Sequence, residues 1–255
     1  MEVMDLLHVL FRWLHIAAGI IWIGHLYFFN FVNIPFAGTL DAETKKKVVP
    51  ELLPRALYWF RWGAAYTWVT GVLLLGLVFY HGGLMFENPE RGWDAPAIVM
   101  LLVTFGGFAL YDALAKSPLG KDLKSMGAIG FVLIAAVMYL MIDWAGFSYR
   151  AYNIHIGTLF GTIMAANVWM RIWPSQKKII AAVKEGAAPD PAVVALAGTR
   201  SRHNTFLSVP LFYTMINMHT TPPGGNSPLY LLGAVALGWI AVQLTYRKSA
   251  SVKGM

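Results

Sequence analysis

Residues Phe11–Phe36 read FRWLHIAAGIIWIGHLYFFNFVNIPF, and this stretch decides the fold class. From Leu14 to its end no residue carries a formal charge, which is long enough for a helix to cross a bilayer. Arg12 and Trp13 stand at its start, where a cation and an aromatic ring are expected at the membrane surface. The stretch therefore predicts a first transmembrane helix over 12–36.

The composition of the whole chain points the same way. Hydrophobic residues make up 57% of the chain and charged residues only 13%, against about 25% charged in soluble domains. Further long apolar runs predict an all-α integral membrane protein, a single domain over 1–255 built as a bundle of about seven transmembrane helices. The predicted helices lie near 12–36, 56–80, 95–115, 126–144, 151–173, 204–219 and 228–246, with a cytoplasmic loop at 174–202.

The positions of Lys and Arg predict the orientation. With the N-terminus outside, all but Arg12, Arg91 and Arg150 of the 20 Lys and Arg residues fall on the cytoplasmic side. The C-terminus is then expected in the cytoplasm. Because membrane insertion accounts for the net charge of +7, we infer no nucleic-acid partner.

The chain contains no cysteine, which excludes disulfides, Cys-ligated iron–sulfur clusters and the CxxCH site of covalent haem. It also contains no P-loop, no GxGxxG after a strand, no GxSxG and no HExxH. The chemistry of soluble enzymes therefore has no recognisable motif here. Haem b stays open as a cofactor, because histidine side chains alone can hold it.

The seven histidines sort by depth in this topology. His15 and His155 are expected at similar depth near the outer side, on the first and fifth predicted helices. A haem b iron needs ligands from different helices on opposite faces of the ring, so these two are the predicted pair, with His219 as the substitute. The simpler reading of each is a hydrogen-bonded side chain at a membrane boundary. His25, near the midplane, is left over for a second ligand or a substrate.

Four runs resemble the membrane domain of the bacterial membrane urate oxidase (urate hydroxylase) family. They are RWLHIAAGIIWIGHLYFFNFVN, FRWGAAYTWVTG, NIHIGTLFGTIMAANVWMRIWPSQ and SRHNTFLSVPLFYTMINMH, and they cover four of the seven predicted helices. In that family a further helix and a periplasmic cytochrome c usually follow the membrane domain. The resemblance implies a multi-pass protein of the bacterial inner membrane that acts in purine catabolism by oxidising urate.

A second resemblance runs through the first helix. LHI, followed by a Trp seven residues after the His and then by an aromatic YF, is similar to membrane protoporphyrinogen oxidases and copper-resistance D-type membrane proteins. In the former the matching histidine is a haem ligand, which carries over to His15 only.

These resemblances lead to specific expectations. Electrons from urate would pass to a separate cytochrome c, since the chain has no c-type haem of its own, and the acidic outer loop of Glu87, Glu90 and Asp94 would attract that carrier. His25, His203 and Asn204 are the catalytic candidates. Urate is an anion, and basic side chains on the cytoplasmic side could attract it, although they could equally serve topology alone: Arg61, Arg171, Arg200 and Arg202.

Two other functions remain open. The chain could be a non-catalytic haem b subunit for electron transfer or structure, or a membrane protein that handles copper. A visible spectrum separates them, because only a haem protein shows a Soret band that shifts on reduction.

Overall fold

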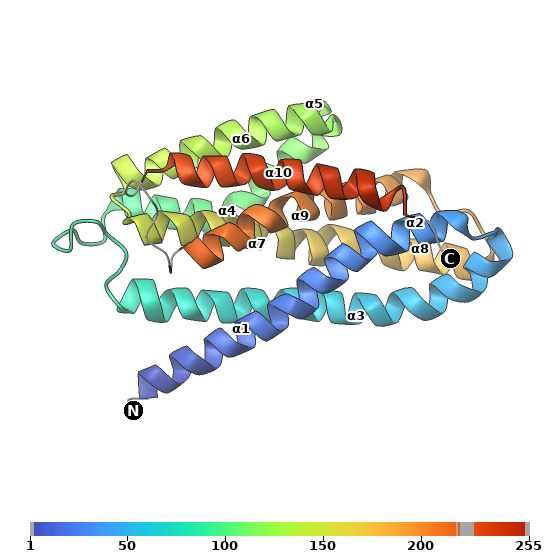
Figure 1. Cartoon of the computed structure of the whole chain (residues 1–255), viewed down its shortest axis with the longest axis horizontal. Coiled ribbons are helices and arrows are strands. Elements are labelled where there is room, and N and C mark those ends of the chain that lie inside the picture. Colours follow the sequence, from blue (N-terminus) through green and yellow to red (C-terminus); the bar gives the residue numbers. More distant parts are fainter. Residues whose placement is uncertain (1–2, 218, 220–226, 253–255) are drawn as a thin grey trace. The chain divides into compact units, whose positions relative to one another are not determined.

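The computed structural model describes residues 3–217, 219 and 227–252, and nearly all of them are helical (Figure 1). Within these residues there is no strand, and one isolated antiparallel bridge joins Phe86 to Phe147. The prediction of an all-α chain is confirmed.

Many helices continue into one another without a break. In chain order, with π-helices written η, they are α1 Val3–Tyr27, η1 Phe28–Asn33, α2 Ile34–Thr39, α3 Ala42–Leu75, η2 Gly76–His81, α4 Ala95–Lys116, α5 Pro118–Lys121, α6 Leu123–Tyr139, η3 Leu140–Trp144, α7 Tyr149–Asn167, η4 Val168–Ile172, α8 Trp173–Glu185, α9 Pro191–Asn217 and α10 Leu229–Ser249. Each predicted transmembrane range is helical over most of its length.

Among the described residues, five helical stretches are long and apolar enough to cross a membrane: Val3–Thr39, Ala42–His81, Ala95–Lys116, Leu123–Trp144 and Leu229–Ser249. All of them expose large apolar side chains, among them Ile20, Leu102 and Leu237. Water would not favour such surfaces, whereas lipid chains cover them at no cost. The chain therefore has the helices of a multi-pass membrane protein, while seven spans and the orientation of the termini stay predictions.

The other two predicted spans, on α7 and α9, are helices of a different character. On α7, Asn153, His155 and Asn167 are completely buried, and so are Asn204 and Thr205 on α9. Polar side chains within a membrane helix are tolerated where other helices cover them and satisfy their hydrogen bonds. Low hydropathy in these two helices thus reflects burial by protein rather than contact with lipid.

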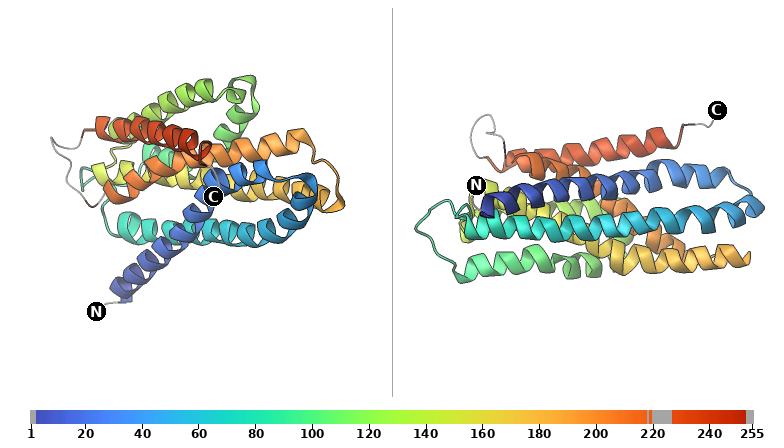
Figure 2. Two further views of the ribbon diagram at one scale, coloured as in Figure 1. Left: turned by 45° about the vertical axis from the view of Figure 1, so that its right-hand side comes forward. Right: turned by 90° about the horizontal axis from the view of Figure 1, so that it is seen from below.

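The chain divides into two compact units, Met1–Gly71 with Met164–Ser208 and Ile240–Met255, and Val72–Ile163 with Val209–Trp239. In the first unit α1 runs beside α3 (Figure 2). Gly63 lies at their closest approach, because a Cβ at this position would be 3.0 Å from the backbone nitrogen of Trp22.

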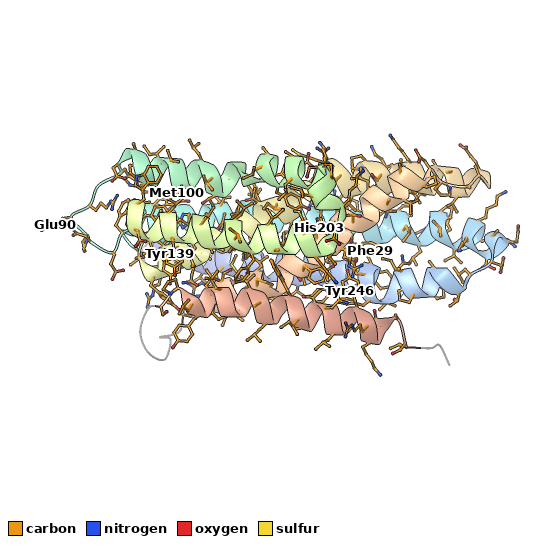
Figure 3. The ribbon with its side chains drawn as sticks, turned by 90° about the horizontal axis from the view of Figure 1, so that it is seen from above. Phe29, Glu90, Met100, Tyr139, His203 and Tyr246 are labelled. Carbon is orange, nitrogen blue, oxygen red and sulfur yellow. The ribbon has the colours of Figure 1, made fainter. Side chains whose placement is uncertain are left out.

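In the second unit α5 forms the turn between α4 and α6 (Figure 1). Asp94 caps the start of α4 by accepting a hydrogen bond from the Ala97 amide at 3.0 Å. Arg91 anchors the preceding loop, because its guanidinium donates hydrogen bonds to Asp94 Oδ2 at 2.7 Å and to the carbonyl oxygen of Trp144 at 2.7 Å. Glu90 lies on the same loop (Figure 3).

The predicted cytoplasmic loop at 174–202 is mostly helical. Its alanine-rich sequence favours helix on both sides of a short break, where α8 ends at Glu185 and α9 begins at Pro191. Gly186 ends α8 in the left-handed conformation with φ 76°, and proline suits the first turn of the next helix.

Candidate functional site

His15 lies on α1 with its imidazole against α3. Its Nδ1 is 2.9 Å from the carbonyl oxygen of Thr67 and 3.3 Å from Thr70 Oγ1. Because a carbonyl oxygen can only accept, Nδ1 carries the proton and Nε2 is left as the basic nitrogen. Gly71 allows this approach, since a Cβ there would lie 3.0 Å from His15 Cε1. The imidazole is held in a tautomer and orientation that suit a metal ligand.

His155 lies on α7 in the second unit and is fully buried. Its Nδ1 donates to the carbonyl oxygen of Ala151 at 2.7 Å, and its Nε2 accepts from the Tyr80 hydroxyl at 3.1 Å. The rings of Phe79, Tyr80 and Phe147 surround it at centroid distances of 6.1, 5.7 and 5.2 Å. Both ring nitrogens have protein partners, so an iron at Nε2 would require the Tyr80 hydroxyl to move.

The remaining histidine candidates differ in burial. His25 is half-buried on α1, with Nδ1 2.7 Å from the carbonyl oxygen of Ile21 and its ring 6.4 Å from that of Phe29. His219 is exposed just beyond α9. Among the described residues, no group of three or more His, Asp or Glu could hold a metal ion. The haem ligand pair therefore stays a prediction.

The two catalytic candidates on α9 are buried. Asn204 Oδ1 accepts from Asn167 Nδ2 at 2.9 Å, and Asn204 Nδ2 donates to the carbonyl oxygen of Met164 at 2.9 Å. Both polar atoms thus have partners on α7, which is the arrangement of an amide that joins two helices. His203 is 6% exposed and lies within electrostatic range of Arg200 and Arg202.

The predicted anion-attracting arginines are held largely by aromatic rings. The Arg61 guanidinium lies 4.2 Å from the centroid of the Trp173 ring, and Arg202 lies 5.0 Å from that of Tyr246. Arg200 is almost completely buried, with 1% of its surface exposed. Within the residues that the structure describes, neither Arg61 nor Arg202 forms an ion pair with a carboxylate. The positive charges of Arg61 and Arg202 therefore lie against aromatic rings and are not neutralised by a carboxylate among the described residues.

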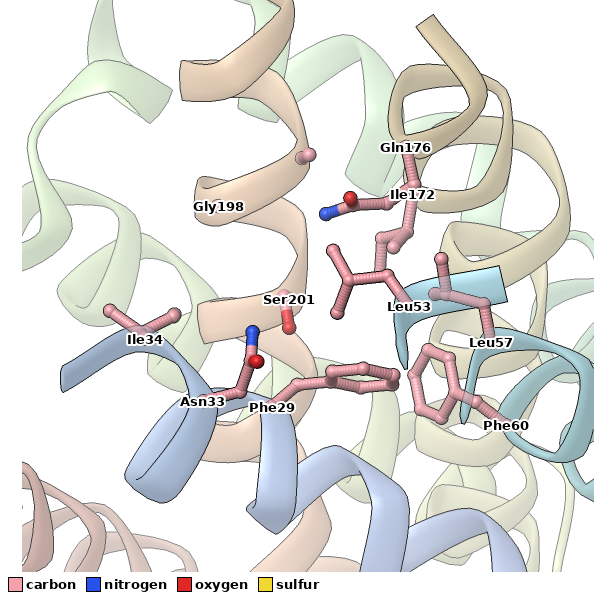
Figure 4. Close-up of a pocket in the computed structure, with 11 residues that line it drawn as sticks. Phe29, Asn33, Ile34, Leu53, Leu57, Phe60, Ile172, Gln176, Gly198 and Ser201 are labelled. Atoms are coloured by element: carbon pink, nitrogen blue, oxygen red, sulfur yellow. The ribbon is translucent and has the colours of Figure 1, made fainter. Parts of the chain in front are cut away.

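A cavity of about 60 Å³ opens in the first unit, between η1, α2, α3, η4, α8 and α9 (Figure 4). This enclosed volume can hold a few water molecules, and the exposed lining residues Ile34 and Gly198 show that the cavity is not closed off from the surface. Its apolar wall consists of large side chains: Phe29, Ile34, Leu53, Leu57, Phe60 and Ile172. Its other lining residues are small or carry an uncharged polar group: Asn33, Gln176, Ala197, Gly198 and Ser201.

The polar groups of this cavity are only partly satisfied by the protein. Gln176 Oε1 is buried and has no hydrogen-bond partner among the described residues, and the Gln176 side chain points into the cavity (Figure 4). Ser201 Oγ accepts from Asn30 Nδ2 at 2.8 Å, and Asn30 Oδ1 in turn accepts from the Tyr246 hydroxyl at 2.8 Å. The hydrogen bond from Asn30 therefore orients the Ser201 hydroxyl, whose own proton can be donated into the cavity.

Two π-helical segments shape this cavity. Phe29 and Asn33 come from η1, and Ile172 comes from η4. A π-helix inserts one residue into the helical turn and redirects the side chains around it, and such segments often occur at functional sites. In the second unit η2 supplies Phe79 and Tyr80 to the surroundings of His155.

The comparisons with known proteins give one result. The family model for the N-terminal domain of urate oxidase matches residues 36–251, which is most of the chain. The chain belongs to the urate oxidase N-terminal family. No curated protein and no solved structure matches it.

The urate oxidase N-terminal match covers the cavity only in part. It includes the lining residues from Leu53 to Ser201, and with them His155, His203 and Asn204. It leaves out α1 and η1, which carry His15 and His25 and the lining residues Phe29 and Asn33.

Gln176 and Ser201 line the cavity of this urate oxidase family member, although the sequence did not predict them as site residues. One signal was present: each predicted anion-attracting arginine is a direct neighbour of a residue that lines the cavity. The pairs are Phe60 with Arg61, Ile172 with Arg171, and Ser201 with both Arg200 and Arg202. Uncharged residues between basic ones look like ordinary helix positions until the fold brings them together.

Proposed function

We propose that this protein is a membrane oxidoreductase that oxidises urate and passes the electrons to a separate cytochrome c. The observation that carries the proposal is membership of the urate oxidase N-terminal family over residues 36–251. In net terms, urate and water would give a hydroxylated product, two protons and two electrons. Two ferric cytochrome c molecules would take up the electrons.

Haem b is the proposed redox group, with His15 as an axial ligand. The fit of His15 rests on its Nδ1–H, which is bound to Thr67 and leaves the Nε2 lone pair for iron. His155 does not fit as it stands, because its Nε2 already accepts from Tyr80. His155 and the exposed His219 stay the predicted choices for the second ligand. A bound haem b would supply one-electron transfer between urate and the carrier.

The proposed docking face for the carrier is the loop before α4. Glu87 and Glu90 are exposed there, whereas the carboxylate of Asp94 is engaged by Arg91 and by the Ala97 amide. The acidic surface that could steer a basic cytochrome therefore consists of Glu87 and Glu90, rather than of the three carboxylates expected from sequence. Steering of this kind acts on the rate of association and weakens as salt screens it.

The deciding assay uses membranes that contain the protein, ferric cytochrome c and urate. We expect urate-dependent reduction of the cytochrome, slower at high salt and absent from matched membranes without the protein. Glu87→Lys combined with Glu90→Lys should slow reduction at low salt and matter less at high salt. A haem-loaded protein that reduces no added carrier would rule out urate oxidation and favour a non-catalytic electron-transfer subunit.

A further inference from the structure

We propose that the cavity bounded by Phe29, Asn33, Gln176 and Ser201 is the binding site for a planar, anionic heterocycle with a lactam edge, the class to which urate belongs. A lactam edge carries an N–H beside a C=O. This assignment rests on the proposed function for the identity of the substrate. The proposed site does not include Asn204, which is a catalytic candidate from the sequence, because both polar atoms of its side chain already have partners on α7.

The hydrogen-bonding groups of the cavity complement such an edge. Leaving the acceptor Gln176 Oε1 buried without a donor among the described residues is unfavourable, and a ligand N–H would remove this penalty. The amide of Gln176 also carries two N–H donors, and the amide of Asn33 offers the same pair of functions. Ser201, whose Oγ accepts from Asn30, can donate its proton to a ligand oxygen. One donor and one acceptor side by side match the C=O and N–H of a lactam.

The shape of the cavity favours a flat molecule. The rings of Phe29 and Phe60 meet edge to face, with centroids 5.3 Å apart and an interplanar angle of 77°. A flat ring can lie against one of these faces while its rim reaches the polar side chains (Figure 4). The enclosed volume of about 60 Å³ is smaller than such a ligand, which would extend past the exposed lining residues Ile34 and Gly198.

The charge around the cavity favours an anion. Among the described residues the lining contains no Asp or Glu, and four arginines lie on the helical segments that form it, although none of them is itself a lining residue: Arg61, Arg171, Arg200 and Arg202. Positive potential in a low-dielectric surrounding stabilises a negative ligand more strongly than it would in water. An oxidised quinone fits less well, because it has no N–H or O–H to donate to Gln176 Oε1.

Gly198 offers a direct way to fill the cavity. It lines the cavity on α9, and a Cβ added there meets no atom within 4 Å. Gly198→Leu should therefore occupy the ligand space without a backbone clash, and leucine favours helix more than glycine does. Gly233→Leu on α10 is the matched control, because Gly233 is exposed and equally unobstructed.

The experiment measures equilibrium binding of labelled urate to the purified full-length protein without any electron acceptor. We expect Gly198→Leu and Gln176→Glu each to weaken binding at least tenfold, the latter because it places a carboxylate against the anion. Gly233→Leu should bind as the parent does, and equal thermal midpoints would show that the variants are folded. Unlabelled xanthine, which keeps the lactam edge, should compete, and benzoate, a flat anion without that edge, should not.

Each contrary outcome has a distinct meaning. Unchanged binding in Gly198→Leu, or no binding of urate or xanthine by the parent protein, overturns the site. Equal competition by benzoate overturns lactam recognition and leaves a site that selects charge alone. Normal binding without cytochrome c reduction leaves the site standing and removes the proposed oxidation. Normal urate-dependent reduction of cytochrome c by Gly198→Leu removes the proposed site and leaves the proposed oxidation standing.

Discussion

At the scale of single residues, the proposal that the protein binds haem b depends on His15. Its ring is held between α1 and α3 by the Thr67 carbonyl oxygen, and the glycine at position 71 makes the space. His8, seven residues earlier on the same helix, has a different setting. Its Nε2 is 2.9 Å from Arg12 Nη2 on an exposed part of the helix. The two histidines therefore form a matched pair for a test of ligation.

His15→Ala should abolish the Soret band of the purified protein, because it removes the Nε2 that is proposed to bind the iron. His8→Ala should leave haem content unchanged. The measurement is the visible spectrum per mole of protein, before and after reduction. Full haem content in His15→Ala would show that the ligand lies elsewhere.

At the scale of the element, the start of α4 depends on one carboxylate. The hydrogen bond from the Ala97 amide, joined by the Arg91 guanidinium, holds the pKa of the Asp94 carboxyl below its usual range. A carboxyl whose pKa is lower in the folded state stabilises the fold above its unfolded pKa of about 3.9. That contribution is lost as the pH falls through the lower, folded value.

Asp94→Asn should keep the cap, since an amide oxygen also accepts from the first turn of a helix. It should lose the ion pair with Arg91, and with it the part of the acid sensitivity that comes from this carboxyl. The thermal midpoint of the parent protein should therefore fall more steeply than that of Asp94→Asn as the pH drops below about 4. Glu90→Gln on the same exposed loop is the control and should behave as the parent does. Identical pH profiles for parent and Asp94→Asn would contradict this account of the cap.

At the scale of the whole molecule, the bias of Lys and Arg predicts which ends of the helices face the cytoplasm. Within the first unit, the Lys46 side chain lies beside Gly186, at the end of α8, so these two basic segments share one side. Reporter fusions at Lys46, Lys121 and Lys178 should all report a cytoplasmic location. An outside signal at any of the three would overturn the predicted orientation.

The all-α class, the membrane character and the family follow from the amino-acid sequence alone. Apolar run length and the positions of charges are properties of the linear chain, so they survive whatever packing follows. Hydropathy was least informative for α7 and α9, because their polar residues such as Asn167 and Asn204 bond to each other inside the protein.

Which polar residues share a cavity depends on tertiary packing and could not be predicted from the sequence. Asn204 and Gln176 are both uncharged amides, the first in the predicted helix 204–219 and the second in the predicted cytoplasmic loop 174–202, and neither setting predicts an amide that faces a cavity. Packing bonds the amide of Asn204 to α7 and leaves the Gln176 oxygen buried in a cavity without a partner in the part of the chain that the structure describes. The cavity combines η1, α2, α3, η4, α8 and α9, which are distant in the chain. Such a site depends on contacts between segments, and those contacts are not a property of any one stretch of sequence.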